Sequence, residues 1–129
     1  MQMQDKIVIN DYIENDPLSE ENLDKTLVTV YEFRLLFPNK SIWLYSGYSW
    51  EECQPFSEEG LLKGSNFAPN LQKILKKRYE IISKCDVIID GRYIDSQRDI
   101  TLKYRGSSNQ KVIDVQQSLQ QGEIILYCD

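Results

Sequence analysis

The sequence contains no histidine, and this absence excludes several kinds of chemistry. Without an imidazole there is no Ser-His-Asp or Cys-His catalytic group, no His-ligated zinc ion and no imidazole general base. The three cysteines are Cys53, Cys85 and Cys128, and their wide spacing matches no local metal or redox motif. We interpret them as buried or unreactive thiols, while noting that cysteines distant in sequence can meet in a fold.

Long apolar runs are also missing. No stretch approaches the roughly 18 to 20 apolar residues of a membrane span, and no basic start followed by an apolar segment indicates a signal peptide. The 15 Lys and Arg against 20 Asp and Glu give a net charge of -5, which argues against a nucleic-acid module. We therefore expect a cytoplasmic protein that binds neither membranes nor nucleic acid, with residues 1–129 forming a single domain.

The apolar pattern alternates between strand-like and helix-like segments. Strands are predicted at residues 7–13, 41–48, 86–90, 100–104 and 124–127, and helices at residues 23–37 and 71–82, with a short helix within 112–119. Asp16 or Ser19 is predicted to cap the first helix. Lys73, Lys76, Lys77 and Arg78 are predicted to lie largely on the solvated side of the second helix. The order of elements indicates an α/β fold with a mostly parallel sheet and flanking helices.

Polar residues and glycines follow the predicted strands. Ligands of α/β sheets bind beyond the carboxyl ends of the strands, so these residues could line a site. Each could equally be present because Gly, Asn, Asp and Ser favour the turns that end strands. Within the set, the segment Arg105 to Gln110 offers a guanidinium, several polar groups and a glycine, which suits a polar ligand or a partner. The full set is Glu14, Asn15, Asp16, Ser46, Gly47, Tyr48, Asp90, Gly91, Arg92 and Arg105 to Gln110.

Three strings resemble successive motifs of a known family. They are Ile-Trp-Leu-Tyr-Ser-Gly-Tyr at 42–48, Asp-Val-Ile-Ile-Asp-Gly-Arg-Tyr at 86–93, and Leu-Lys-Tyr-Arg-Gly-Ser-Ser-Asn-Gln at 102–110 with Val-Ile-Asp-Val at 112–115. In this order and spacing they resemble the activating proteins of anaerobic ribonucleoside-triphosphate reductase, from about residue 16 to the C-terminus.

The resemblance implies a radical S-adenosylmethionine enzyme on an open (β/α) barrel. Such an enzyme uses a [4Fe-4S] cluster to cleave S-adenosylmethionine, and the product radical creates a glycyl radical on the large reductase subunit, its partner. The cofactor-binding positions that the resemblance implies are Asp16, Ser46, Tyr48, Asp90, Arg105, Ser107 and Asn109.

The sequence departs from the family pattern at two places. The family holds its cluster with Cys-x3-Cys-x2-Cys in an N-terminal loop, which is absent here, and widely spaced cysteines do not replace it. The family string Gly-Gly-Asp-Pro corresponds to Glu14-Asn15-Asp16-Pro17, so both glycines that let the backbone approach the methionine end of the cofactor are replaced.

We therefore expect a partial barrel, the C-terminal part of an activase, truncated or diverged and inactive alone, with no catalytic or metal-binding residue of its own. The alternative is a cluster-free interaction domain that docks on the reductase, complements a separate cluster-bearing chain or associates with itself through an unpaired strand edge near residues 7–13. An unrelated α/β domain that shares these strings by coincidence is a third interpretation.

Overall fold

The computed structural model describes residues 5–55 and 68–128. The strands are β1 (Lys6–Val8), β2 (Ser41–Tyr45), β3 (Val87–Asp90) and β4 (Lys111–Asp114), and the α-helices are α1 (Leu23–Leu36), α3 (Ala68–Ser83) and α4 (Val115–Gln121). Short 3-10 turns cover Ile9–Asp11, Glu20–Asn22, Glu51–Cys53 and Asp95–Gln97. Within the two described ranges, every helix is too short or too polar to cross a bilayer.

The four strands form one open sheet in the order β1-β2-β3-β4. β1 pairs with β2 and β2 pairs with β3 in parallel, whereas β4 pairs with β3 antiparallel. The helices α1 and α3 make the crossovers between the parallel strands, as βαβ units require. The predicted α/β class with a mostly parallel sheet is therefore confirmed, and the sheet is open rather than closed into a barrel.

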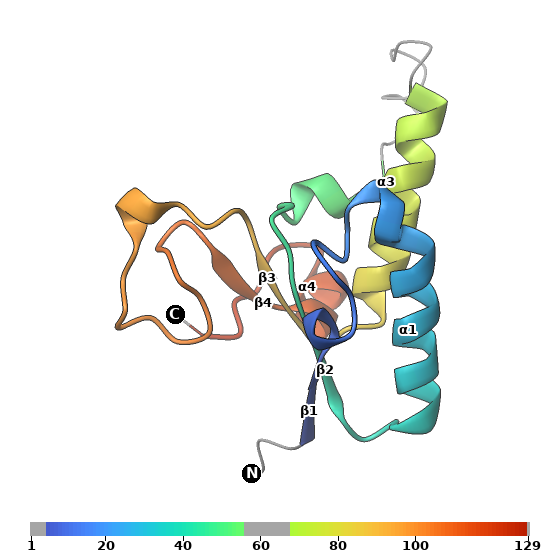
Figure 1. Ribbon diagram of the computed structural model, residues 1–129, viewed down its shortest axis with the longest axis horizontal. Helices are drawn as coiled ribbons and strands as arrows, with labels where there is room; N and C mark the ends of the chain where they lie inside the picture. The colour runs from blue at the N-terminus through green and yellow to red at the C-terminus, as the bar shows by residue number, and fades with distance from the viewer. Residues whose placement is uncertain (1–4, 56–67, 129) are drawn as a thin grey trace.

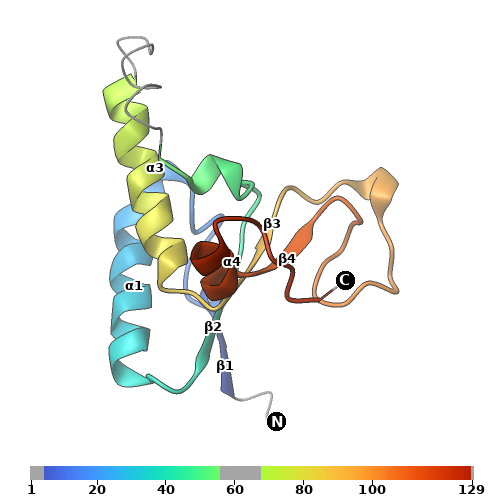
Figure 2. The same cartoon turned by 180° about the vertical axis from the view of Figure 1, so that it is seen from behind.

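The helices gather on one face of the sheet (Figure 1, Figure 2). The main core lies on that face, where Ile9, Leu44, Ile82 and other side chains are fully buried. A smaller cluster of Trp43, Val87, Ile89 and Val112 lies on the opposite face. All four residues of β3 are buried, which explains its uninterrupted Val-Ile-Ile run, because a strand covered on both faces has no polar side.

The first predicted strand is wrong beyond Val8. Residues Ile9–Asp11 form a 3-10 turn instead of continuing to residue 13. The side chain of Asn10 takes the place of the missing strand, because its amide nitrogen donates to the Tyr45 carbonyl at 2.9 Å and its amide oxygen accepts the Tyr45 N–H at 2.8 Å. The strand therefore ends early without leaving the backbone of β2 unpaired at this point.

Two further predicted strands are also wrong. Residues 100–104 form turns, because the Asp99 carboxylate accepts both the N–H and the hydroxyl of Thr101, and Tyr104 has a left-handed φ of 68°. These hydrogen bonds to Thr101 also lower the pKa of Asp99. Residues 124–127 run beside β4 with one isolated bridge, Ile113 to Leu126, and do not form a strand. Alternating apolar residues predict which side of a segment is buried, but the segment becomes a strand only where a neighbouring strand pairs with it.

We expect Asn10→Ala to lower the free energy of unfolding by about 1 to 2 kcal/mol, since two hydrogen bonds to the Tyr45 backbone are lost. Urea unfolding followed by circular dichroism measures this difference. The control is Asp11→Ala at the exposed neighbouring position. Equal stabilities of the two variants would show that the Asn10 side chain does not hold the end of β1.

Candidate functional site

Asp16 joins the loop after β1 to the end of β2. Its Oδ1 accepts the Ser46 hydroxyl at 2.8 Å and the Leu18 N–H at 2.9 Å, while its Oδ2 accepts the Gly47 N–H at 2.8 Å. The hydroxyl of Ser46 in turn accepts the Tyr48 N–H at 3.0 Å. One carboxylate therefore fixes the carboxyl-end loops of two adjacent strands, since hydrogen bonds to a charged acceptor are among the stronger ones in proteins.

Asn15 preserves one property of the glycine that the resemblance leads us to expect at its position. Its φ of 64° lies in the left-handed region, which glycine adopts freely and asparagine tolerates better than most residues. The backbone path is therefore kept, whereas the space that a glycine would leave is partly filled by the Asn15 side chain. Glu14, at the other replaced glycine, is exposed.

Asp90 ends β3 and is almost completely buried. Its carboxylate accepts the Trp50 N–H at 2.8 Å and the Lys111 N–H at 3.2 Å, and the Lys111 ammonium lies 3.4 Å away. Asp90 therefore ties the segment after β2 to the start of β4. Tyr48 belongs to the same region, because its carbonyl accepts the Gly91 N–H at 3.3 Å.

The segment between β3 and β4 projects from the body of the molecule, drawn in orange in Figure 1. We call residues 91–110 the arm. Inside it, the Ser107 hydroxyl donates to the Asn109 side chain at 2.6 Å, and Asn109 donates to the Arg92 carbonyl at 2.7 Å. Gln110 accepts the Gly106 and Ser107 N–H groups and donates to the Gly91 carbonyl at 3.0 Å. The side chains of Ser107, Asn109 and Gln110 thus stabilise the fold of the arm.

Arg105 also bonds within the arm. Its Nη1 donates to the backbone carbonyls of Ser108 and Gln110, and its Nε is buried without a hydrogen-bond partner. A guanidinium engaged in this way closes its own loop.

A polar pocket of about 300 Å³ lies beyond the carboxyl ends of the parallel strands. Two of the predicted cofactor-binding residues, Asp16 and Ser46, line it, and the other five, Tyr48, Asp90, Arg105, Ser107 and Asn109, do not. Tyr93 and Asn10 are lining residues that sequence reasoning did not select. The complete lining is Asn10, Asn15, Asp16, Tyr45, Ser46, Gly47, Gly91, Tyr93 and Gln110.

Arg78 is the clearest residue that sequence reasoning misplaced. Its predicted place on the solvated side of the helix is wrong, because it is buried and donates to the Leu18 carbonyl at 2.9 Å and the Glu52 carbonyl at 3.2 Å. The guanidinium also lies 3.8 Å from the centre of the Tyr48 ring. Its spacing could have revealed this, since Arg78 follows Leu75 by three residues on the buried side of the helix.

The three cysteines do not fit an iron-sulfur cluster. Cys53 and Cys85 are buried, and burial raises the pKa of each thiol to about 12, which disfavours the thiolate that binds iron. Within residues 5–55 and 68–128, no group of three or more Cys, Asp or Glu side chains is arranged to hold a metal ion. The ligand set that a cluster needs is therefore not formed by the cysteines of this chain.

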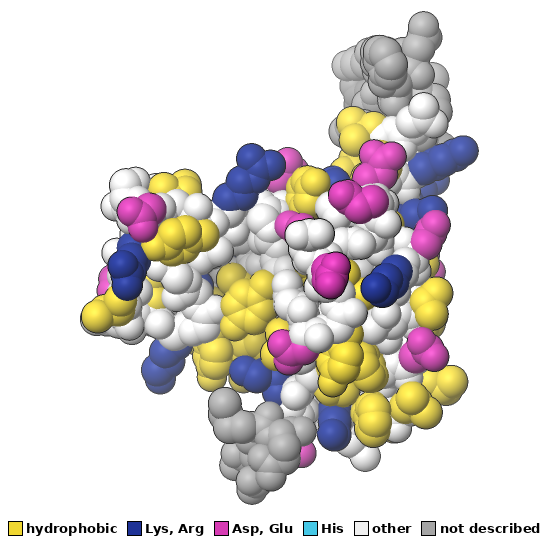
Figure 3. Space-filling model, viewed as in Figure 1, with side chains coloured by type: hydrophobic (Ala, Val, Ile, Leu, Met, Phe, Trp, Pro, Cys, Tyr) yellow, Lys and Arg dark blue, Asp and Glu magenta, His cyan; other side chains and the backbone are white. Residues whose placement is uncertain are grey.

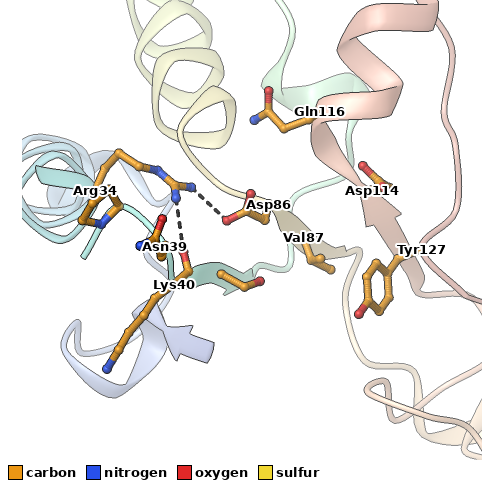
Figure 4. A pocket seen from close by; sticks show the side chains of 10 residues that line it. Arg34, Asn39, Lys40, Asp86, Val87, Asp114, Gln116 and Tyr127 are labelled. Atoms are coloured by element: carbon orange, nitrogen blue, oxygen red, sulfur yellow. Dashed lines mark hydrogen bonds and ion pairs between the residues drawn. The ribbon is translucent and has the colours of Figure 1, made fainter. Parts of the chain in front are cut away.

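A second pocket, of about 310 Å³, lies at the opposite end of the parallel strands (Figure 4). Arg34 points toward Asp86 and Lys40 there, and its guanidinium donates to the Asp86 carboxylate at 2.9 Å and to the Lys40 carbonyl at 3.2 Å. The same guanidinium donates to the Lys84 carbonyl at 2.6 Å. These bonds hold α1 against the loops before β2 and β3, so we assign this end of the sheet a role in stability.

Comparison with known proteins identifies the class of this α/β domain. Residues 15–113 match the family model of the 4Fe-4S single cluster domain, and the chain belongs to that family. The chain is also similar to particular proteins. The chain is 32% identical over 97 residues to the anaerobic ribonucleoside-triphosphate reductase-activating protein of Vibrio cholerae, and 27% identical over 97 residues to that of Escherichia coli K12.

The corresponding protein of Enterobacteria phage T4 is 29% identical over 99 residues. Each of these three matches covers 75% of this chain, but only 49% of the two bacterial proteins and 47% of the phage protein. The chain thus spans about half the length of the curated relatives it matches. No solved structure matches it. The resemblance based on the three sequence strings is confirmed.

Iodoacetamide at pH 8 should modify Cys128 of the folded protein much faster than Cys53 or Cys85. Cys128 is partly exposed, whereas the other two thiols are buried and have pKa values of about 12, so very few are thiolates at this pH. Peptide mass spectrometry measures each site, and protein unfolded in urea should react at all three. Modification of Cys53 at the rate of Cys128 in the folded protein would contradict the burial described here.

Proposed function

We propose that this chain is the part of an anaerobic ribonucleoside-triphosphate reductase-activating protein that binds S-adenosylmethionine and faces the reductase, and that it does not generate a glycyl radical alone. The observation that carries the proposal is the polar pocket at the carboxyl ends of the parallel strands, organised by Asp16. This is where α/β sheets bind their ligands. We take the class of reaction from the names of the relatives.

The lining of the pocket is chemically suited to S-adenosylmethionine. Asp16 Oδ2 accepts the N–H of Gly47 and keeps acceptor capacity for an ammonium group. Gly47 and Gly91 line the pocket, and Tyr93 presents a half-exposed ring for an adenine base. When bound, S-adenosylmethionine supplies the deoxyadenosyl group on which the chemistry of the family depends.

The other predicted site residues support the pocket through their neighbours. In this proposal Ser46 and Tyr48 hold the loop after β2, and Asp90 holds the segments that follow β2 and β3. Arg105, Ser107 and Asn109 act by keeping the arm folded. They are positioning residues, and their replacement would weaken cofactor binding by loosening the arm.

The arm is the surface that we assign to the reductase. It projects to one side of the helices (Figure 1), with Tyr104 packed 4.8 Å from the Trp43 ring of β2, and exposes Tyr93, Ile94 and Ile100, the last at 85% of its surface. Exposed large apolar side chains beside a cofactor pocket suit contact with a protein partner. We further propose that the described fold corresponds to the C-terminal part of an open radical S-adenosylmethionine barrel, with its helices on the outer face.

The interaction-domain alternative shares most of this account. Both accounts take the iron-sulfur cluster to be bound outside these residues, since their cysteines form no cluster-binding set. The two accounts differ in one property, because an interaction domain that only docks needs no affinity for S-adenosylmethionine.

Isothermal titration of the protein with S-adenosylmethionine tests the proposal. We expect binding by the unmodified chain and about tenfold weaker binding by Tyr93→Ala, since loss of a stacked base costs on the order of 1 to 3 kcal/mol. Tyr127→Ala is the matched control, because Tyr127 is exposed to a similar extent, 48% against 50%, and lies outside the pocket. Failure of the unmodified chain to bind S-adenosylmethionine would instead favour the interaction domain.

A further inference from the structure

The arm is a folded unit of its own. Within the described part of the chain, residues 92–110 hydrogen-bond only with one another and with Gly91. No ion pair among the described residues joins them to the sheet or the helices. Gly91 is tied to the body by its N–H, which donates to the Tyr48 carbonyl at 3.3 Å. Polar contacts therefore fix the shape of the arm, but they do not fix its position beyond its base.

The Tyr104 side chain packs the arm against the sheet. Its ring lies 4.8 Å from the Trp43 ring on β2 and 6.2 Å from the Tyr127 ring, and the Lys6 ammonium lies 5.1 Å from its centre. Trp43 belongs to the smaller apolar cluster, on the face of the sheet that the helices do not cover. Figure 3 shows hydrophobic side chains gathered where the arm meets the body. We call the contact of Tyr104 with Trp43 the aromatic latch.

Tyr104 adopts a backbone conformation that its contacts must stabilise. Its φ of 68° lies in the left-handed region, which costs free energy for a bulky residue and persists only where the surroundings stabilise it. Tilted aromatic rings at the distance of Tyr104 and Trp43 attract one another, and Lys6 adds a cation–π contact. The ring contacts thus hold the arm against a strain that release of the ring would relieve.

The position of the arm matters because the arm forms one side of the polar pocket. Gly91, Tyr93 and Gln110 line the pocket from the arm, whereas Asp16 and Ser46 line it from the loops that follow β1 and β2. A movement of the arm would separate these two sides. A ligand that contacts both sides binds the held position better, so ligand binding and the aromatic latch should stabilise each other.

We propose that the aromatic latch regulates the pocket. With Tyr104 against Trp43 the arm completes the site, and with Tyr104 released the arm moves away as a folded unit and the site opens. This rests on the function proposed above, in which the pocket binds S-adenosylmethionine. Tyr104 is a positioning residue, since it does not line the pocket itself. Because coupling is reciprocal, S-adenosylmethionine should favour the latched arm by the factor by which the latch raises its affinity.

The distance between the tip of the arm and α1 reports the position of the arm. Nitroxide labels are attached at Ile100→Cys in the arm and Lys25→Cys on α1, which are both exposed positions. The background carries Cys128→Ser, and Cys53 and Cys85 are buried and should stay unlabelled. Double electron–electron resonance measures the distribution of distances between the two labels, and circular dichroism checks that each variant is folded.

We expect a narrow distribution for the protein with Tyr104 and for Tyr104→Phe, and a much broader one for Tyr104→Ala. Tyr127→Ala is the matched control and should stay narrow, because it removes a ring 5.1 Å from Trp43 that does not belong to the arm. Tyr104 is 39% exposed and lies outside the main core, so Tyr104→Ala should keep the fold of the body. An equally narrow distribution for Tyr104→Ala would overturn the proposal.

Two further measurements test the movement and its coupling to the pocket. Hydrogen exchange should leave the arm protected in Tyr104→Ala, for example at the Ser108 N–H that donates to the Gln97 carbonyl. Loss of that protection would show that the arm unfolds, against the proposal. Titration calorimetry should give about five- to tenfold weaker binding of S-adenosylmethionine by Tyr104→Ala than by Tyr104→Phe. Saturating S-adenosylmethionine should narrow the distance distribution of Tyr104→Ala.

The results separate this proposal from the proposed function. Equal affinity of Tyr104→Ala and Tyr104→Phe for S-adenosylmethionine, with a broad distribution in the first, would reject regulation by the latch and leave the proposed function standing. No binding of S-adenosylmethionine by the unmodified chain, with a distribution that Tyr104→Ala still broadens, would reject the proposed function and support the latch as the contact that positions the arm.

Discussion

The site depends on one carboxylate, that of Asp16. It accepts hydrogen bonds from Leu18, Ser46 and Gly47, which belong to two segments about 30 residues apart in the chain. The sheet brings these segments to the same edge because β1 and β2 are parallel, and the carboxylate then fixes their loops. The pocket, the left-handed turn at Asn15 and the position of Tyr48 all follow from this arrangement.

The sequence predicts the parallel part of this fold well, and the reason is visible in particular residues. The buried run Val87 to Ile89 and the apolar side of α1 are repetitive patterns that reflect the core directly. Residues 100–104 and Arg78 were misjudged because their outcome depends on single long-range or turn contacts, with Asp99 in one case and Leu18 in the other. The spacing of Arg78 from Leu75 places it on the buried side of the helix, but a periodic pattern does not identify the partner that either residue bonds.

The candidate site was also predicted only in part. Asp16 and Ser46, two of the cofactor-binding positions that the resemblance implies, line the pocket, whereas Arg105 is engaged with carbonyls of its own loop. Tyr93 ends one of the three family-like strings, but nothing in the sequence assigned its side chain to the pocket. The chain therefore belongs to a family named for an iron-sulfur cluster, although its own cysteines do not suit the cluster and its pocket is the site that we propose for the organic cofactor.

The central claim is that this chain binds S-adenosylmethionine but holds no iron-sulfur cluster by itself. Anaerobic reconstitution with iron and sulfide tests this claim most directly. Iron and sulfide bound per chain are measured after desalting, together with visible absorbance and affinity for S-adenosylmethionine. The account predicts that the chain alone binds S-adenosylmethionine and retains no cluster, because its buried thiols have pKa values of about 12. A stable [4Fe-4S] cluster on the chain alone, with cleavage of S-adenosylmethionine, would contradict it.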